Sequence, residues 1–259
     1  MYKLRVILKS ISFSIAQATI FRSSFLIFFF WLFIDTLIKI LFFSAIYSQV
    51  SSIGGWTYEQ AVLLVIFHGM MYDFAWTLYV TAFNNFIDNF PEGGFDFILL
   101  KPMHPITYIT TTGFSATSFS GARLSLLFYA IFFLPIVWHM PNVLAAILVF
   151  ICGLVAIHGA FAIMSAIIFF VVRGDFIYDL IFNLIDGGQY PFSIFPMAAR
   201  FFFTFILPVF LIANFPVMMI SNMINLDLAW VAIVIAVAIE LVAFKVWNYA
   251  IKHYSSASS

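Results

Sequence analysis

The sequence predicts an all-α, polytopic membrane protein that forms a single transmembrane domain over residues 1–259, and three observations lead to this class. Hydrophobic residues make up 64% of the chain and charged residues only 8%, against roughly 25% charged in a typical soluble domain. The mean hydropathy is +1.11, and too few charges remain to cover the surface of a soluble fold. Apolar stretches of bilayer-crossing length recur along the chain, and their continuous apolarity predicts helices rather than alternating strands.

Composition also limits the function. The formal net charge is zero, which argues against bulk electrostatic binding of nucleic acid. The single cysteine, Cys152, excludes an internal disulfide and a cysteine metal cluster, and we expect it to be a small buried side chain. The sequence contains no H-E-x-x-H or G-x-S-x-G pattern, so the chain is not expected to be an enzyme or to carry catalytic or metal-binding residues.

Residues 1–21 are predicted to form an amphipathic helix that lies in the membrane interface. Ser12, Ser14 and Gln17 interrupt the apolar core that a cleavable signal peptide requires. Apolar residues instead recur at helical spacing, with the basic residues mostly on the other side, near anionic head groups. The apolar stripe consists of Leu4, Leu8, Ile11, Ile15 and Ala18.

Six segments beyond that helix are long and apolar enough to cross a bilayer core about 30 Å thick. Backbone groups at that depth must be hydrogen-bonded within the segment, so each segment is predicted to be a helix. Pro135 is expected to distort the end of the third span, and Pro208 lies inside the fifth. The predicted spans are residues 24–48, 58–83, 112–138, 143–172, 197–215 and 228–249.

The basic residues predict the orientation of these spans. With six crossings, both termini share a side with the connections 84–111 and 173–196. The opposite connections, 49–57, 139–142 and 221–227, contain no Lys or Arg. Because basic residues are retained on the cytoplasmic side, both termini are predicted to be cytoplasmic. The basic residues assigned to that side are Lys3, Arg5, Lys9, Arg22, Lys101, Arg173, Arg200 and Lys252.

The connection after the second span contains a short helix between chain breakers. Pro91 and the Gly93-Gly94 pair are expected to end the preceding helix, and Pro102 and Pro105 to end the next one. Two interpretations remain open: a surface that a cytoplasmic protein grips, or an interfacial loop that packs on lipid head groups. The side chains expected to be exposed are Phe95, Phe97, Ile98, Leu99 and Leu100, framed by Asp96 and Lys101.

This segment resembles the cytoplasmic loop of permease subunits from ATP-binding-cassette (ABC) transporters of the type-two exporter class, in particular a six-span group of bacterial permeases. Met103 and His104, between the two prolines, depart from the pattern. The resemblance covers most of the chain. Its first motif comprises Gly94, Phe95, Asp96, Leu99, Leu100, Lys101, Pro102 and Pro105, and its second comprises Tyr190, Pro191, Ile194, Phe195, Pro196, Arg200, Pro208, Phe210 and Pro216.

The resemblance implies a permease of an ATP-driven exporter in the bacterial plasma (inner) membrane. The aromatic content of 20% favours an amphipathic or lipid-like substrate over ions. It implies two copies of a cytoplasmic ABC ATPase and a second permease, identical or homologous. The sequence has no G-x-x-x-x-G-K-[ST] phosphate loop, so ATP and Mg²⁺ are expected on the ATPase and no cofactor on this chain. The implied ATPase-coupling residues are Glu92, Gly93, Gly94, Phe95, Asp96, Phe97, Leu99, Leu100, Lys101, Pro102 and Pro105.

Polar residues inside the predicted spans are costly in lipid and are therefore functional candidates. Asp35 and Lys39 lie four residues apart and are expected to pair, either as a structural pair or as a substrate contact. His68 and Asp73 in the second span, and Glu240 with Lys245 in the sixth, are candidates to bind each other across helices. His158 is expected to hydrogen-bond a neighbouring carbonyl group. The candidates are Asp35, Lys39, His68, Asp73 and Glu240.

The stretch 214–227 is predicted to fold back into the outer leaflet as a re-entrant helix between the fifth and sixth spans. It is too apolar for a solvated loop and too polar for a continuous crossing. The alternative is a kinked fifth helix that continues to about Ile220. Two other functions also remain open: a non-transport anchor or assembly subunit, and a proton-coupled secondary transporter that uses Asp35, Asp73 or Glu240 as a relay.

Overall fold

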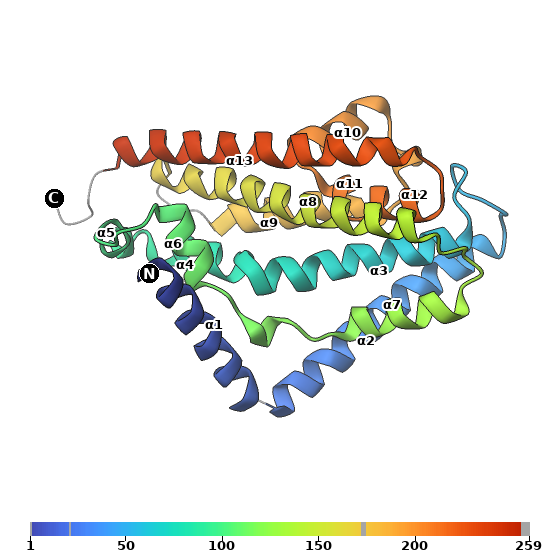
Figure 1. Ribbon diagram of the computed structural model, residues 1–259, viewed down its shortest axis with the longest axis horizontal. Helices are drawn as coiled ribbons and strands as arrows, with labels where there is room; N and C mark the ends of the chain where they lie inside the picture. The colour runs from blue at the N-terminus through green and yellow to red at the C-terminus, as the bar shows by residue number, and fades with distance from the viewer. Residues whose placement is uncertain (1, 21, 172–174, 255–259) are drawn as a thin grey trace.

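The computed structural model describes residues 2–20, 22–171 and 175–254, and helices dominate these ranges. Within them the β-structure is one isolated bridge between Ile53 and Trp56. The long helices lie roughly along one axis (Figure 1). We call the end that holds helix α5 (Gly94–Leu99) the α5 end, and the end that holds the connection between α2 and α3 the α2–α3 end.

Four helices have the length and apolarity of a membrane crossing, and they confirm the first, second, fourth and sixth predicted spans. Each has 25 to 32 residues, which at about 1.5 Å per residue exceeds a bilayer core of about 30 Å. The helical segments are α2 (Arg22–Tyr47), α3 (Tyr58–Ala75) continuing through the π-helical turn η1 (Trp76–Val80) into α4 (Thr81–Asn89), α8 (Met140–Ser165) continuing into η3 (Ala166–Phe169), and α13 (Ala229–Lys252).

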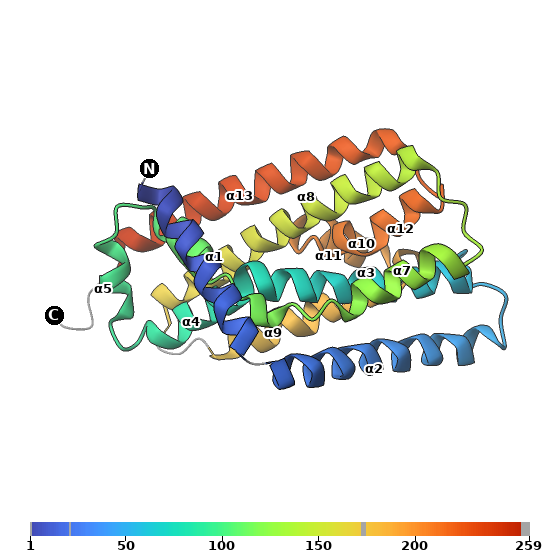
Figure 2. The same cartoon turned by 60° about the horizontal axis from the view of Figure 1, so that its bottom comes forward.

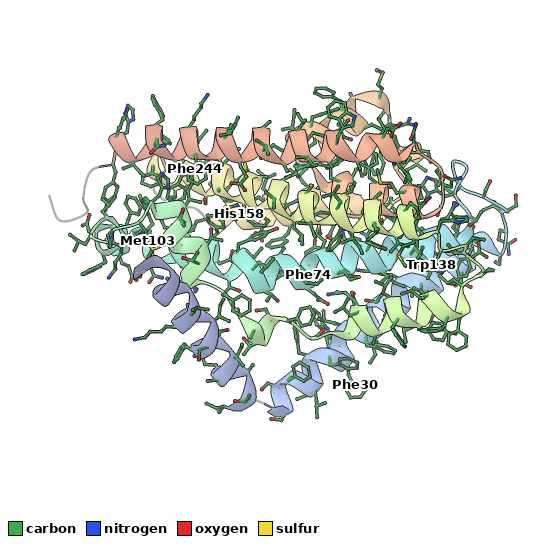
Figure 3. The ribbon with its side chains drawn as sticks, viewed as in Figure 1. Phe30, Phe74, Met103, Trp138, His158 and Phe244 are labelled. Atoms are coloured by element: carbon green, nitrogen blue, oxygen red, sulfur yellow. The ribbon has the colours of Figure 1, made fainter. Side chains whose placement is uncertain are left out.

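The α3–α4 helix forms the centre of the bundle, and α2 lies at its edge (Figure 1). In the most apolar window of each, 78% of the α3–α4 residues are buried but only 11% of the α2 residues. Phe30 accordingly projects outward from α2, whereas His158 lies within the bundle on α8 (Figure 3). A helix that is apolar on every side and exposed on most of them is suited to a lipid environment.

The predicted third span is wrong as a single helix over residues 112–138. The chain forms α6 (Pro105–Thr112), a 3₁₀ turn η2 (Ala116–Ser118) and then α7 (Ala122–Phe133). Gly121 has a φ of 72°, which an α-helix cannot contain, and Leu134 before Pro135 is extended. At 12 residues α7 is about 18 Å long, too short to cross alone. The interrupted segment still runs from the α5 end towards the α2–α3 end (Figure 1).

The predicted connection 173–196 is also wrong, because it does not stay at the α5 end. After α9 (Asp175–Ile185) come the 3₁₀ turns η4 (Asp186–Gln189) and η5 (Phe192–Ile194). The ring of His68 hydrogen-bonds the Ile185 carbonyl at 3.1 Å, and Ser193 lies directly against Gly54 in the α2–α3 connection. The segment therefore runs through the bundle. Its polar Asp186-Gly187-Gly188 sequence resembles a loop, yet the Gly188 carbonyl accepts a buried hydrogen bond from Asn214.

The predicted fifth span is a bent pair of helical arms. The first arm is α10 (Met197–Phe201) with the π-helical turn η6 (Phe202–Ile206), and the second is α11 (Val209–Ile212) with α12 (Asn214–Ile220). They meet at 74° across Leu207 and Pro208. The Asn142 side chain, at the start of α8, donates to the Met219 carbonyl at 2.7 Å. A 3₁₀ turn, η7 (Leu226–Leu228), leads into α13.

Helix α1 (Tyr2–Ile20) fills most of the range predicted for the N-terminal helix. It crosses the bundle obliquely near the α5 end (Figure 2). The hydroxyl group of Ser14 accepts the Ala116 N–H at 2.7 Å, and that of Ser10 donates to the Thr112 carbonyl at 3.0 Å. The side of α1 that packs on the protein is therefore its serine side, while Leu8 and Ile15 are exposed.

Candidate functional site: the α5 surface and an intramembrane charge cluster

The chain reverses sharply between α4 and α5. Gly93 has a φ of 78°, a left-handed conformation that favours glycine. A Cβ atom on Gly94 would stand 2.8 Å from the Asn89 carbonyl oxygen, so this position also requires glycine. The reversal places α5 across the end of the bundle, and Pro102 follows it after one turn.

Phe95 anchors α5 to the bundle, and the prediction that it is exposed is wrong. Its side chain is 1% exposed. Its ring lies 4.9 Å from that of Phe169 and 4.9 Å from that of Tyr254 (centroid to centroid), both in edge-to-face geometry. The Tyr254 hydroxyl donates to Asp96 at 3.1 Å. The cluster joins α5 to α4, η3 and the end of α13 through Phe86, Phe90, Phe95, Phe169, Trp247 and Tyr254.

The opposite side of α5 presents apolar side chains, which we call the α5 surface. It consists of Phe97, Leu99 and Leu100, which are 69%, 42% and 79% exposed. Beside it lies a hollow of about 470 Å³, whose walls include Phe97 and Tyr108. Glu92, Lys101 and Pro102 are exposed around it, and Pro105 is buried at the first position of α6.

Met103 and His104, which depart from the family pattern, pack inward. Met103 is buried, and the His104 ring lies 4.9 Å from that of Phe244 and 3.2 Å from the Asn248 side-chain oxygen. Figure 3 shows Met103 and Phe244 at the same end of the bundle. This pair of residues fastens the start of α6 to α13, so the α5 helix is held at both of its ends.

A cluster of charged residues lies among α2, α3 and α7. Asp35 and Lys39 form the pair expected from their spacing, with 3.3 Å between Oδ2 and Nζ. Arg123 on α7 donates to Asp73 on α3 at 2.5 Å and to Asp35 on α2 at 3.4 Å. We call Asp35, Lys39, Asp73 and Arg123 the charge cluster. Charges at this depth are paired because an isolated one is costly in a low-dielectric environment.

Residues 33–258 match the family model described as "ABC-2 family transporter protein". The chain belongs to this family. It is therefore a permease component of an ABC transporter and a multi-pass membrane protein, and family membership implies an ABC ATPase subunit as its partner. We found no significant match to this ABC-2 permease among curated proteins or among solved structures.

The remaining polar candidates of the permease do not form the suggested pairs. His68 bonds the Ile185 carbonyl, and Asp73 bonds Arg123. Glu240 accepts from His158 at 2.6 Å and does not pair with Lys245; the prediction of a carbonyl partner for His158 is also wrong. The second nitrogen of the His158 ring lies 2.8 Å from the Thr110 hydroxyl. Within the described ranges no group of three His, Cys, Asp or Glu residues is placed to hold a metal ion.

Arg123 is the functional candidate that the sequence argument missed. It is 5% exposed and contacts both carboxylates of the charge cluster. The signal was present, because an arginine at the start of an apolar helix inside a predicted span is as costly in lipid as Asp35 or Asp73. Its partners could not be inferred, since they come from two other helices.

Proposed function

We propose that this ABC-2 permease couples ATP hydrolysis by a separate cytoplasmic ATPase to the export of an amphipathic substrate. The α5 surface is the observation that carries the proposal. Phe97 and Leu100 are exposed on a helix that is too short to span a membrane and that lies at one end of the bundle, level with the end of α13. Exposed apolar side chains grouped on a rigid element are typical of a protein-docking surface.

The anchoring of α5 supports a mechanical role for that surface. Phe95 packs on Phe169 of η3 and on Trp247 of α13, so a force applied to Phe97 reaches two long helices through contacts between rigid aromatic rings. Packed interiors transmit displacement because they have little free volume. An interfacial loop that only rests on lipid head groups would not need this anchor.

The basic residues support a cytoplasmic α5 end in a bacterial plasma membrane. Lys101 and Lys252 lie at that end, where α1 begins and α13 ends. Arg200 does not belong to this set, because its guanidinium group donates to the Ser193 and Phe195 carbonyls near the α2–α3 end. Arg173 lies outside the described residues. The remaining excess of basic residues still favours cytoplasmic termini.

The geometry supports six crossings, with the interrupted segment 105–139 as the third and α9 with its following turns as the fifth. The bent pair 197–220 then forms a re-entrant hairpin from the outer side. Ser193 before the hairpin contacts Gly54, and Met219 near its end bonds Asn142, so both arms return to the α2–α3 end. Broken backbone is tolerated at membrane depth where protein buries it, and Asn214 is fully buried.

A second permease, identical or homologous, and two ATPase copies complete the proposed assembly. Asp186 supports a second protein subunit that covers this side of the bundle. Its carboxylate is exposed, and it accepts a hydrogen bond from Tyr72 of the long helix α3. An exposed carboxylate at the depth of that helix is unfavourable against lipid and is expected to face protein or a water-filled path. ATP and Mg²⁺ are assigned to the ATPase subunits.

The alternative of a proton relay through Asp35, Asp73 and Glu240 has less support. Asp35 and Asp73 share Arg123, whereas Glu240 pairs with His158 in a separate cavity beside α1. A relay needs a continuous hydrogen-bonded route, and the described hydrogen bonds do not join these two groups. A non-transport anchor would use the α5 surface in the same way, and only a transport assay separates it from an exporter.

Replacing Phe97 and Leu100 together by Asp tests the docking proposal. Each apolar anchor contributes about 1.5–3 kcal/mol when buried, so the double variant is expected to lose the ATPase on co-purification while remaining in the membrane. The matched control replaces Val137 and Met140 together by Asp. These two side chains are 69% and 68% exposed near the other end of the bundle. Undiminished co-purification with the Phe97 and Leu100 variant would contradict the proposal.

A further inference from the structure

A cavity of about 480 Å³ lies between α2, α3, α7 and α9, on the side of the charge cluster. Its walls combine aromatic rings with carboxylates. The rings come from Phe28 and Trp31 on α2, Trp76 at the π-helical turn η1, and Phe182 on α9. π-Helical turns inside long helices occur frequently at functional sites, and this one directly follows the helix that carries Asp73.

The charges around the cavity do not balance. Its walls carry three carboxylates, from Asp35, Asp73 and Asp186, against the two cations of Lys39 and Arg123. Both cations are already engaged, with Asp35 or Asp73. Asp186 has no ion-pair partner among the described residues; its one hydrogen bond there comes from the Tyr72 hydroxyl at 2.7 Å. The cavity therefore has one negative charge in excess.

A second unsatisfied group points to the same kind of ligand. Asp73 is 3% exposed and lines the cavity. Its Oδ1 atom accepts from Arg123, but its Oδ2 atom is buried without a hydrogen-bond partner in the described structure. A buried acceptor left unpaired is costly, so this oxygen favours a ligand that brings a donor or a positive charge.

The aromatic walls favour a cation in the same way. The rings of Trp76 and Phe182 are stacked with centroids 5.5 Å apart, and the ring of Tyr72 also stacks on that of Phe182, with centroids 5.8 Å apart. The faces of such rings attract cations, and organic ammonium groups are recognised by aromatic cages. These rings also bind an apolar body by burial of its surface.

We propose that this cavity binds an organic cation with an apolar body, in which Asp186 and Asp73 face the positive charge and the aromatic rings contact the body. The binding of the cation does not depend on the proposed function. Only the further step, that such a cation is the class of substrate that the permease moves, rests on it. The cavity needs no ATPase in order to bind, so binding is measured on the permease alone.

Tetraphenylphosphonium and tetraphenylborate test this proposal, because the two ions share one shape and carry opposite charges. Binding of each to the purified full-length permease in lipid nanodiscs is measured by equilibrium dialysis. We expect the cation to bind more tightly than the anion. Asp186→Asn is expected to weaken cation binding ~10-fold, the equivalent of ~1.4 kcal/mol. The control Asp88→Asn changes an exposed carboxylate outside the cavity and is expected to have no effect.

Equal affinity for the two ions overturns the proposal without reference to any variant, and so does unchanged cation binding in a folded Asp186→Asn permease. The co-purification experiment with the Phe97 and Leu100 variant tests ATPase docking. Its outcome does not affect the measurement of cation binding. Cation binding without ATPase docking would remove the transport role and retain the site.

Discussion

Arg123 of α7 donates a hydrogen bond to Asp73 of α3 at 2.5 Å, and both side chains are buried. The same guanidinium group reaches the Thr36 hydroxyl at 3.3 Å and Asp35 at 3.4 Å, both on α2. One arginine therefore joins three helices at membrane depth. These contacts fix the position of α7 against α2 and α3. Apolar packing of a helix of only 12 residues would not determine that position by itself.

Replacing Arg123 by Met is expected to destabilise the permease strongly, because it leaves the Asp73 carboxylate buried without a partner. Removing one member of a buried ion pair costs about 3–5 kcal/mol. The double variant Arg123→Met with Asp73→Asn removes both charges and is expected to recover much of that loss. Thermal unfolding in one detergent, compared across the two variants, measures the effect. Equal loss in both variants would show that the pairing with Asp73 is not what the arginine provides.

Phe95 and Phe97 are the same residue type on one short helix and are expected to respond in opposite ways. Phe95→Ala empties the centre of an aromatic cluster and is expected to cost about 3–5 kcal/mol. Phe97→Ala removes an exposed ring and is expected to change stability by about 0.5 kcal/mol or less while weakening ATPase binding. The melting temperature and ATPase co-purification of both variants are measured together. Similar melting temperatures would contradict the anchoring role of Phe95.

The exposure of these two rings could not be separated from sequence alone. The breakers Pro91, Gly93 and Gly94 correctly predict a short helix, but a helix of this length has too few residues to establish which side faces the protein. Its partners, Phe169 and Trp247, come from distant parts of the chain. The four long apolar helices were predictable because length and apolarity follow directly from the thickness of a bilayer.

Cysteine labelling at residue 194 tests the corrected course of the segment 175–196. Ile194 is 48% exposed and follows Ser193, which contacts Gly54. In a background with Cys152 replaced by Ala, Ile194→Cys is expected to react with a membrane-impermeant reagent from the same side as Ser52→Cys. Asn89→Cys, near α5, is expected to react from the other side. Labelling of residue 194 together with residue 89 would restore the cytoplasmic connection that the sequence predicts.

The error at this segment has a physical cause. Hydropathy detects long continuous crossings, whereas α9 has only 11 residues and is followed by Asp186 and two glycines. The Tyr72 hydroxyl donates to the exposed Asp186 carboxylate, and the Asn214 side chain donates to the buried Gly188 carbonyl. These hydrogen bonds depend on side chains from other helices, so they cannot be inferred from local composition. The same reason explains the interruption of the third predicted span between Gly113 and Gly121.

The proposed hairpin predicts a profile of external accessibility along residues 197–223. Met197, which is 88% exposed, and Met223, which is 37% exposed, are expected to label from outside when each is replaced by Cys. Asn214 is the first residue of α12 and is fully buried, so a cysteine at this position is expected not to react with the external reagent. Labelling of residue 197 from the cytoplasmic side only would instead indicate a single bent span that crosses the membrane.

Site-specific photocrosslinking at residue 97 tests the central proposal most directly. A photoreactive amino acid replaces Phe97 in the intact membrane, and a second variant carries it at Val137, which is equally exposed near the opposite end. We expect residue 97 to crosslink to a protein that mass spectrometry identifies as an ABC ATPase, by its G-x-x-x-x-G-K-[ST] phosphate loop, and residue 137 not to do so. Crosslinks from residue 97 to lipid alone, or to the ATPase from residue 137, would contradict ATPase docking on the α5 surface.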